Sequence, residues 1–360
     1  MSYVVPIGPY HPALEEPVHA KLYTEGELIK DAEVFVGYNH RGIEKLATER
    51  NAIQTIVLVE RVCGICSHSH AMNYAMAVEG VNGTEVPKRG QYIRVITCEL
   101  ERLHSHLLWL GIACHLIGHD SLFMRIWDVR EPIMDMLEKL SGNRVNYAMC
   151  IPGGARRDIS DEMRREFLAG LTATLPILDR IVEIATTDKT IALRTKGVGV
   201  LTTEDAIRQG AVGPHARASG VAIDVRKDHP YSSYDDFDFN IAVCDSCDVY
   251  ARVVVRALEC YESAKILVQA LENLPEGPIN LGNKIPKIAE GEFVSLIEAP
   301  RGQLAHKVVG NGSQLNHRLS IHVPTFKNAP TIPTMLRGNS VADGGLIVAS
   351  IDPCFSCLDD

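Results

Sequence analysis

The sequence lacks any segment that would insert into a membrane or bind nucleic acid. Its first residues, MSYVVPIGPYHP, carry no basic segment, and two prolines interrupt the short apolar stretch, so we expect no signal peptide. The longest apolar run within a predicted helix, residues 107–118, is too short for a bilayer core of about 30 Å. No dense cluster of Lys and Arg occurs, and the net charge of −9 argues against nucleic acid as a partner. Any membrane association is therefore expected to come through a partner.

Low-complexity linkers and internal repeats are also missing from the sequence. Apolar residues make up 46% and charged residues 22% of the 360 positions, which is typical of globular proteins and leaves no segment expected to be disordered. A chain of this length can bury a sizeable core. We therefore expect a single domain over residues 1–360.

Hydrophobic periodicity divides this domain into three parts. Residues 1–43 alternate like β structure, with a hairpin turn at Glu25 and Gly26. Residues 44–275 have the three- and four-residue spacing of helices, over residues 44–80, 90–117, 121–140, 160–187 and 247–273. Residues 276–360 are mixed, with short extended segments expected at residues 293–302, 318–326 and 344–353. The pattern predicts a predominantly α member of the α+β class, in which a central long-helix bundle has small β parts at both ends.

Cysteine is unusually frequent in this sequence. We do not expect a disulfide framework, because the chain is apparently cytosolic and that compartment keeps thiols reduced. Six of the ten cysteines form three C-x-x-C pairs, and such pairs in reduced surroundings indicate metal or redox chemistry. The pairs are Cys63 with Cys66, Cys244 with Cys247, and Cys354 with Cys357. The remaining cysteines are Cys98, Cys114, Cys150 and Cys260.

The two outer pairs carry a stronger signal than the middle pair. Gly64 lies inside the first pair and allows the backbone to approach a ligand closely. The middle pair, Cys244 and Cys247, stands at the start of a predicted long helix, and we expect it to be structural because free cysteine is among the most buried residue types.

His115 and His119 are four residues apart, but no third ligand accompanies them, so we expect core or interface histidines.

If the outer pairs converge, four thiolates surround one site. Soft thiolates select zinc, copper(I), iron–sulfur clusters or nickel, and a structural Zn²⁺ that clips two distant segments together is one interpretation. Such a clip does not need the polar residues that accompany the cysteines in Gly- or Pro-rich segments, which resemble the outer shell of a reactive metal. These residues are Glu16, Arg41, Glu44, His70 and Arg301.

The motifs RGIE (41–44), RVCGICSHSH (61–70), EAPRG (298–302), VPT (323–325) and DPCFSC (352–357) together resemble those of the catalytic large subunit of NiFe-hydrogenases. The stretches GPYHPALEEP (8–17) and ERLHSHLLWLG (101–111) are similar to the energy-converting, membrane-bound, ferredoxin-linked branch, close to the carbon-monoxide-induced type and related to the 49-kDa subunit of complex I. The resemblance covers essentially the whole chain.

This resemblance implies a set of metal ligands. Cys63 and Cys354 would bind nickel as terminal ligands, and Cys66 and Cys357 would bridge nickel and iron. The iron would also carry carbon monoxide and cyanide. Glu44 would be a ligand of a second, structural divalent cation such as Mg²⁺. Asp360 departs from the family, which has His or Arg at that position, so the role of the terminal residue stays open.

The resemblance also implies roles for the residues around the metals. Arg301 and Pro300 would lie against the diatomic ligands, and Thr325 would donate a hydrogen bond to a cyanide. Asp352 would orient Arg301, and His70 would form a hydrogen bond with a bridging thiolate. Protons would pass from Cys354, acting as the base, to Glu16, with Glu15 as the less favoured neighbour.

The implied activity is reversible oxidation of dihydrogen and reduction of protons. Electrons would pass through a hydrogenase small subunit with a 4Fe-4S cluster to a ferredoxin-type carrier, by way of Fe–S subunits. Integral-membrane antiporter-like subunits would couple this to ion translocation and would hold the chain peripherally at the cytoplasmic side of the cell membrane. The alternative is a non-catalytic structural subunit of a complex I-like assembly with a four-cysteine zinc site.

Overall fold

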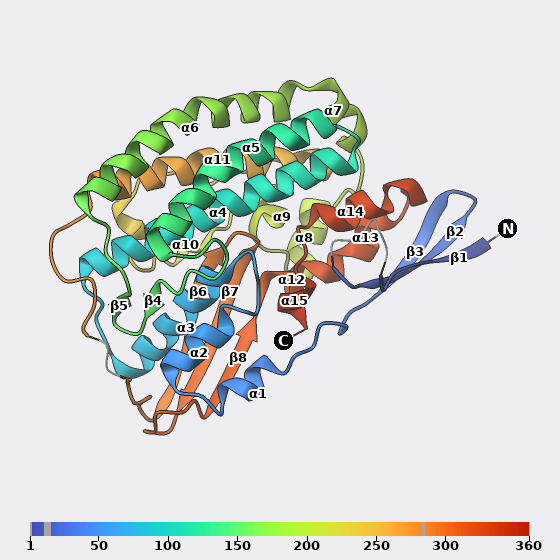
Figure 1. Cartoon of the computed structure of the whole chain (residues 1–360). Helices are drawn as coiled ribbons and strands as arrows, with labels where there is room; N and C mark the ends of the chain where they lie inside the picture. The colour runs from blue at the N-terminus through green and yellow to red at the C-terminus, as the bar shows by residue number, and fades with distance from the viewer. Residues whose placement is uncertain (1, 11–15, 283–284, 360) are drawn as a thin grey trace.

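The fold is known from a computed structural model that describes residues 2–10, 16–282 and 285–359 (Figure 1). Four long helices form a bundle, in which α4 contacts α5 and α11, and α6 contacts α5 and α11. α4 and α11 are buried on most sides, whereas α5 and α6 each bury one apolar face. Their bounds are α4 Lys88–Leu116, α5 Asp120–Ser141, α6 Asp161–Thr187 and α11 Val249–Glu272.

Two antiparallel three-stranded sheets lie outside the bundle. The first pairs β1 (Ser2–Ile7) with β2 (His19–Glu25) and β2 with β3 (Leu28–Phe35). The second has the order β6 (Gly291–Ala299), β7 (Gly302–Gly310) and β8 (Arg318–His322). A two-stranded ladder joins β4 (Cys150–Ile151) to β5 (Gly154–Ala155). The predicted α+β class, mainly helical with small β parts at both ends, is confirmed.

The helical stretch predicted for residues 44–80 is interrupted at the first cysteine pair. It consists of α1 (Ile43–Ala47), α2 (Ala52–Val59) and α3 (Ser67–Asn82), and a loop with Cys63 separates α2 from α3. Asn51 begins α2 with a capping box, because its side chain accepts from the Gln54 N–H and the Gln54 side chain accepts from the Asn51 N–H. α3 packs on β6 and β7, which places the cysteine loop at the edge of the second sheet.

Shorter helices follow α6 and precede α11 in the sequence, and others make up most of the carboxyl-terminal part. The first group is α7 (Lys189–Thr195), α8 (Thr203–Gln209), α9 (Gly213–Arg217) and α10 (Val225–Asp228), followed by the 3₁₀ turn η1 (Tyr234–Asp236). The second group is α12 (Pro324–Asn328), η2 (Ala329–Thr331), α13 (Ile332–Leu336), η3 (Val341–Asp343), α14 (Gly344–Ser350) and α15 (Phe355–Leu358).

The extended segment expected at residues 344–353 is wrong, because residues 344–350 form α14. The segment expected at residues 318–326 is extended only as far as Val323, because α12 begins at Pro324. The helix α14 packs against α4, α11 and α13 and buries Leu346, Ile347 and Val348. A short apolar segment surrounded on several sides has no polar face, so its sequence shows no helical period. Its β-branched residues then suggest a strand although the tertiary contacts favour a helix.

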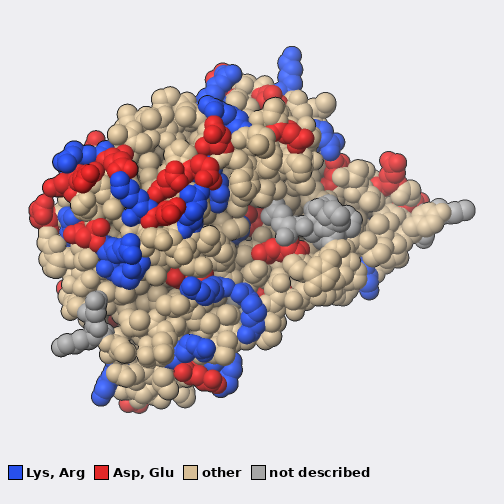
Figure 2. All heavy atoms as spheres, in the orientation of Figure 1, with Lys and Arg blue, Asp and Glu red and all other residues tan. Residues whose placement is uncertain are grey.

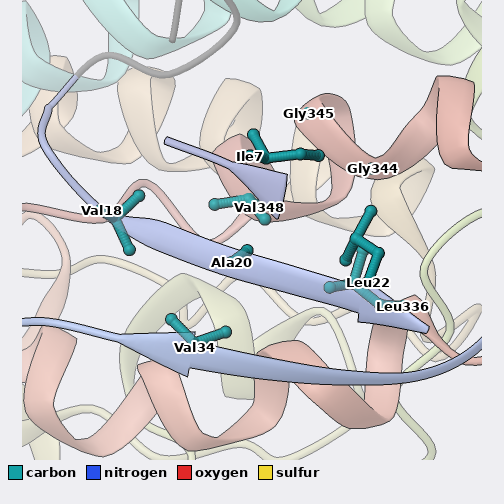
Figure 3. Close-up of a pocket in the computed structure, with 9 residues that line it drawn as sticks. All are labelled: Ile7, Val18, Ala20, Leu22, Val34, Leu336, Gly344, Gly345 and Val348. Carbon is teal, nitrogen blue, oxygen red and sulfur yellow. The ribbon is translucent and has the colours of Figure 1, made fainter. Parts of the chain in front are cut away.

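The two ends of the chain pack against each other. The first sheet lies beside α13 and α14, as Figure 1 shows. Side chains from all three strands and from both helices line a small apolar pocket at this contact, and they surround it in Figure 3. They are Ile7, Val18, Ala20, Leu22, Val34, Leu336, Gly344, Gly345 and Val348. This contact brings the segment at Glu16 close to the second cysteine pair.

Buried ion pairs connect the bundle to the second sheet. Arg217 on α9 contacts Glu259 on α11 and Glu298 on β6, each at 2.8 Å. Arg226 on α10 contacts Asp224 at 2.7 Å. Burial alone would raise the pKa of Asp224, but the guanidinium groups of Arg226 and Arg217 lower it to about 2. These pairs are almost fully buried, so removing one partner would leave a charge without compensation.

The surface carries charges of both signs. On the face in Figure 2, acidic and basic side chains intermingle over α5 and α6. Arg144, which follows α5, contacts Glu131 and Asp135 of that helix. Across the described ranges, no helix is both long enough and apolar enough to cross a membrane.

Candidate metal centre

The two outer cysteine pairs converge in the folded chain. Cys63 lies in the loop before α3 and Cys66 immediately precedes that helix, whereas Cys354 and Cys357 lie at the start of and within α15. The Cys354 sulfur lies 3.5 Å from that of Cys63 and 2.9 Å from that of Cys357. The sulfurs of Cys63, Cys66 and Cys357 lie within 4.8 Å of one another. All four side chains are buried.

The four thiols strongly shift one another's pKa values. Hydrogen bonds from Cys354, Cys357 and Cys66 hold the pKa of Cys63 well below its ordinary value, and the Arg301 guanidinium adds to this effect. The backbone N–H groups of Ile65 and Cys66 also donate to the Cys63 sulfur. Burial raises the pKa of Cys357 well above its ordinary value. The site therefore favours one thiolate in the absence of further positive charge, and a cation would be needed to hold four.

Arg301 lies in the turn between β6 and β7 and points toward the cysteines. Its Nε donates to the Asp352 carbonyl oxygen at 2.8 Å, and its Nη2 donates to Asp352 Oδ1 at 2.7 Å. Burial opposes its charge, but the Asp352 carboxylate and the Cys63 thiolate raise the pKa of Arg301 well above its ordinary value. Nη1 is 3.5 Å from the Ser105 hydroxyl. The guanidinium is thus fixed by a fork of two bonds to one residue.

Thr325 and Pro300 are also buried near the second pair. Thr325 Oγ1 accepts a hydrogen bond from the Cys354 backbone N–H at 3.1 Å. This leaves the hydroxyl proton of Thr325 available to another acceptor. Pro300 directly precedes Arg301 and has no N–H of its own.

Glu16 reaches the second cysteine pair from the amino-terminal segment. Its Oε2 accepts from the backbone N–H groups of Phe355 and Ser356, and its Oε1 accepts from the Ser356 hydroxyl at 2.8 Å. Oε1 also lies 3.8 Å from the Cys354 sulfur. The first turn of α15 therefore holds the carboxylate next to a cysteine sulfur.

His70 and His306 form a buried pair next to Cys357. His70 Nε2 is 3.7 Å from the Cys357 sulfur, and His70 Nδ1 is 3.3 Å from His306 Nε2. Burial lowers the pKa of His70 to about 4 and lowers that of His306 well below its ordinary value. Both rings are therefore neutral at physiological pH.

Arg41 ties the two cysteine segments together. Its guanidinium donates to the carbonyl oxygens of Arg61 at 2.6 Å, Val62 at 3.0 Å and Ser356 at 2.6 Å. These acceptors lie just before Cys63 and between Cys354 and Cys357. One side chain thus spans both halves of the site.

Comparison with known proteins places these residues in a family. The chain is 42% identical to "Carbon monoxide-induced hydrogenase" of Rhodospirillum rubrum over 99% of both chains. It is also 42% identical to "Membrane-bound hydrogenase subunit alpha" of Pyrococcus furiosus, over 99% of this chain and 87% of that protein. The chain belongs to the family of membrane-bound hydrogenase large subunits and their complex I relatives.

Two family models match this hydrogenase-family chain. "Nickel-dependent hydrogenase" matches residues 41–119, and "Respiratory-chain NADH dehydrogenase, 49 Kd subunit" matches residues 117–288 and 280–360. A subunit of the NADH-quinone oxidoreductase of Desulfotalea psychrophila is 37% identical over 98% of this chain and 95% of that protein. The fold agrees with a chain of the membrane-bound sulfane sulfur reductase, an archaeal respiratory membrane complex, at a TM-score of 0.94 and 32% identity, covering 100% of this chain and 98% of that chain.

The donor set of this hydrogenase-family site fits nickel and iron. Four buried thiols offer the soft ligands that such metals select, and no other group of three or more His, Cys, Asp or Glu ligand atoms gathers in the part of the chain that the structure describes. An arginine, a carboxylate and an imidazole lie next to the sulfurs. A closed structural zinc site has no need of such neighbours.

Some residues singled out in the sequence lie elsewhere. Glu44 Oε1 accepts from the Ile321 backbone N–H at 2.7 Å, and no ligand cluster includes Glu44 among the described residues. Cys244 and Cys247 are partly buried just before α11 and outside the cysteine cluster. His115 is exposed and bonds Asp120, so it does not lie in the core, and an interface role for it stays a prediction. Glu15 and Asp360 lie outside the described residues.

Two contributors to the site had not been expected. Glu101 on α4 accepts from the backbone N–H groups of His68 and Ser69 at 2.6 and 2.9 Å, which caps the helix that follows Cys66. His306 lies behind His70. The signal for His306 is the alternation of buried and partly buried residues along β7, which places it on the inner face two positions after Leu304.

Proposed function

We propose that this chain is the catalytic subunit of a NiFe-hydrogenase, which oxidises dihydrogen and reduces protons reversibly. The observation that carries this proposal is the convergence of four buried cysteines with the Arg301 fork and the Glu16 carboxylate, in a chain 42% identical to two proteins named as hydrogenases. Splitting dihydrogen requires a Lewis acid and a nearby base, and this arrangement can supply both.

The cysteines divide into two roles in this proposal. Cys63 and Cys354 would hold nickel, and Cys66 and Cys357 would hold both nickel and an iron that would also carry carbon monoxide and cyanide. When bound, the metal pair supplies the Lewis acid that polarises dihydrogen. Holding four thiolates in one buried place then costs little, because the metal ions compensate their charge.

In this proposal, the Arg301 side chain would lie against the space between the two cysteine pairs. Asp352 accepts two of its hydrogen bonds, so the guanidinium keeps one orientation, and its charge lies near enough to Cys63 and Cys354 to interact with their thiolates. Pro300 contributes an apolar, donor-free wall. The Thr325 hydroxyl accepts from Cys354 N–H, and its own proton would be available to a cyanide ligand of the iron.

Glu16 is the first proton carrier outside the cysteines. A proton held on the Cys354 sulfur moves 3.8 Å to Glu16 Oε1. Three hydrogen bonds from residues 355 and 356 hold the carboxylate at this distance. Glu15, one residue earlier, is the less favoured carrier.

His70 and Arg41 support the ligands in this proposal. His70 donates from Nε2 to the bridging Cys357 sulfur, and Arg41 keeps the two cysteine segments in register. Glu44 contributes to a second, structural divalent cation such as Mg²⁺.

We place the chain in a larger electron-transfer assembly. Electrons pass to a small subunit with a 4Fe-4S cluster and, through Fe–S subunits, to a ferredoxin-type carrier. Integral-membrane antiporter-like subunits couple the reaction to ion translocation and hold the chain at the cytoplasmic side of the membrane. The support is that the relatives include a membrane-bound hydrogenase subunit and a chain of a respiratory membrane complex.

The test is metal analysis and dihydrogen/deuterium exchange of the complex purified with its maturation factors present. We expect nickel in the large subunit at one atom per chain, together with exchange activity. Stoichiometric zinc in place of nickel, with no exchange, would instead support the structural subunit of a complex I-like assembly with a four-cysteine zinc site.

A further inference from the structure

His306 is a buried imidazole that the proposed chemistry does not use. It lies on β7, is 0% exposed, and its Nε2 is 3.3 Å from Nδ1 of His70 on α3. The two ring centroids are 5.4 Å apart at an interplanar angle of 43°, so the contact is an edge-directed hydrogen bond rather than a stack. The other nitrogen of His306, Nδ1, has no hydrogen-bond partner in the described part of the chain.

The proton positions in this pair follow from its neighbours, because each neutral imidazole has one donor and one acceptor nitrogen. Cys357 must be deprotonated to ligate a metal, and its sulfur can then only accept. His70 Nε2, at 3.7 Å from that sulfur, must therefore carry the hydrogen. His70 Nδ1 is then a bare acceptor, and the hydrogen between the two rings must be on His306 Nε2.

The opposite assignment is energetically less favourable. It would direct a lone pair of His70 at a thiolate sulfur and would leave a buried Nδ1–H of His306 without an acceptor. Neither ring bonds to a carboxylate in the described residues, so no acidic partner holds a second proton on the pair.

We propose that His306 is a positioning residue for the metal centre: its Nε2–H holds the ring of His70 in the tautomer and orientation that donate to the bridging Cys357 sulfur. This inference rests on the proposed function, since it requires Cys357 to be a metal ligand. Hydrogen bonds to a metal thiolate withdraw electron density from the sulfur, so His306 also influences the electron density at the iron.

The contact between α3 and β7 fixes the distance over which His306 acts. Asn73, one turn after His70, donates from Nδ2 to the Leu304 carbonyl oxygen at 3.1 Å. The Ser295 hydroxyl on β6 donates to the Asn73 carbonyl oxygen at 2.7 Å. The helix is thus tied to both strands next to His306, and the imidazole pair cannot separate without breaking these bonds.

The experiment compares His306→Leu, His306→Gln and the parent in the matured complex. Leucine fills similar space without a donor, whereas the Gln amide N–H can occupy the place of the His306 Nε2–H. Tyr74→Phe is the matched control, because it removes another buried hydrogen bond between α3 and the carboxyl-terminal part, the 2.7 Å bond from Tyr74 to Asn316. The readouts are nickel and iron content, the infrared bands of iron-bound carbon monoxide and cyanide, and dihydrogen/deuterium exchange.

We expect His306→Leu to keep both metals but to shift the infrared bands and to lower exchange by roughly 10- to 100-fold, the usual effect of losing an outer-shell partner. His306→Gln should keep the bands at the parent positions, and so should Tyr74→Phe. Parent-like bands in His306→Leu would overturn the inference while leaving the proposed function intact.

If His306→Leu does not assemble, His306→Gln decides the question, because bands displaced from the parent positions in that variant would also overturn it. A parent complex with no such bands would reject the proposed function and this inference with it.

Discussion

Replacing Arg301 with Lys tests how the guanidinium fork contributes to the proposed reaction. Arg301 donates two charge-assisted hydrogen bonds to Asp352, at 2.8 and 2.7 Å, and both groups are nearly fully buried. A lysine ammonium keeps the charge, but as a single point it cannot bond the carbonyl and the carboxylate in the same fork geometry. At least one of the two bonds is therefore lost, and the positive charge moves relative to the cysteines.

The size of the effect follows from the lost bond. A hydrogen bond to a charged group contributes about 1.5–3 kcal/mol. If the fork holds the cation where charge develops in the transition state, this loss lowers the rate by roughly 10- to 150-fold, since about 1.4 kcal/mol corresponds to a factor of ten. Because Asp352 keeps a cationic partner, we expect the protein to fold and the metals to be inserted.

The assay is dihydrogen/deuterium exchange by the matured complex, normalised to its nickel content. Arg337→Lys is the matched control, because Arg337 makes the same kind of fork, from Nε and Nη2 to Asp31 Oδ1, on the exposed surface. The control should exchange at the parent rate. An Arg301→Lys complex with full nickel content and parental exchange would refute the reasoning, because it would show that the fork does not act on the reacting atoms.

Three further changes test other parts of the account. Cys354→Ser should abolish exchange and lower nickel content, since a terminal ligand is lost; full exchange would remove that assignment. Glu16→Gln should keep both metals but slow proton exit, so deuterium exchange with solvent should fall by roughly 10²- to 10⁴-fold, and an unchanged rate would direct attention to Glu15. Because the pKa of Asp224 is lowered to about 2, its carboxylate stabilises the fold above about pH 4, and this contribution, about 2 kcal/mol, is lost as the pH falls through 2. Asp224→Asn should therefore flatten the acid-unfolding profile followed by circular dichroism, and a profile as steep as that of the parent would contradict this.

The long helices could be predicted from sequence because their apolar spacing persists over many turns. α4, α5, α6 and α11 begin and end within two residues of the predicted limits. Periodicity failed where the segment is short and buried on several sides, as in α14, and where a loop interrupts the helical stretch, as at Cys63. In both cases tertiary contacts decide the local structure, and the spacing of apolar residues in a short segment cannot predict those contacts.

The candidate site, like the fold, could be predicted from the sequence only in part. The cysteine pairs, Arg301 and Glu16 were identified because their motifs have fixed spacing, and the structure brings them together. Glu101 and His306 lie in an ordinary helix and strand, so their importance depends on which neighbours the fold provides. Only the contacts of α3 with α4 and β7 show that Glu101 bonds the start of α3 and that His306 bonds His70.

The most direct test of the central claim is an infrared spectrum of the purified, matured complex in the window where metal-bound carbon monoxide and cyanide absorb. Protein groups absorb little in this region, so bands there report the iron ligands alone. The account predicts such bands in the parent and their loss when Cys357 is replaced by Ser. A blank spectrum from protein replete with metal would contradict it, and the four cysteines would then be assigned to a zinc site.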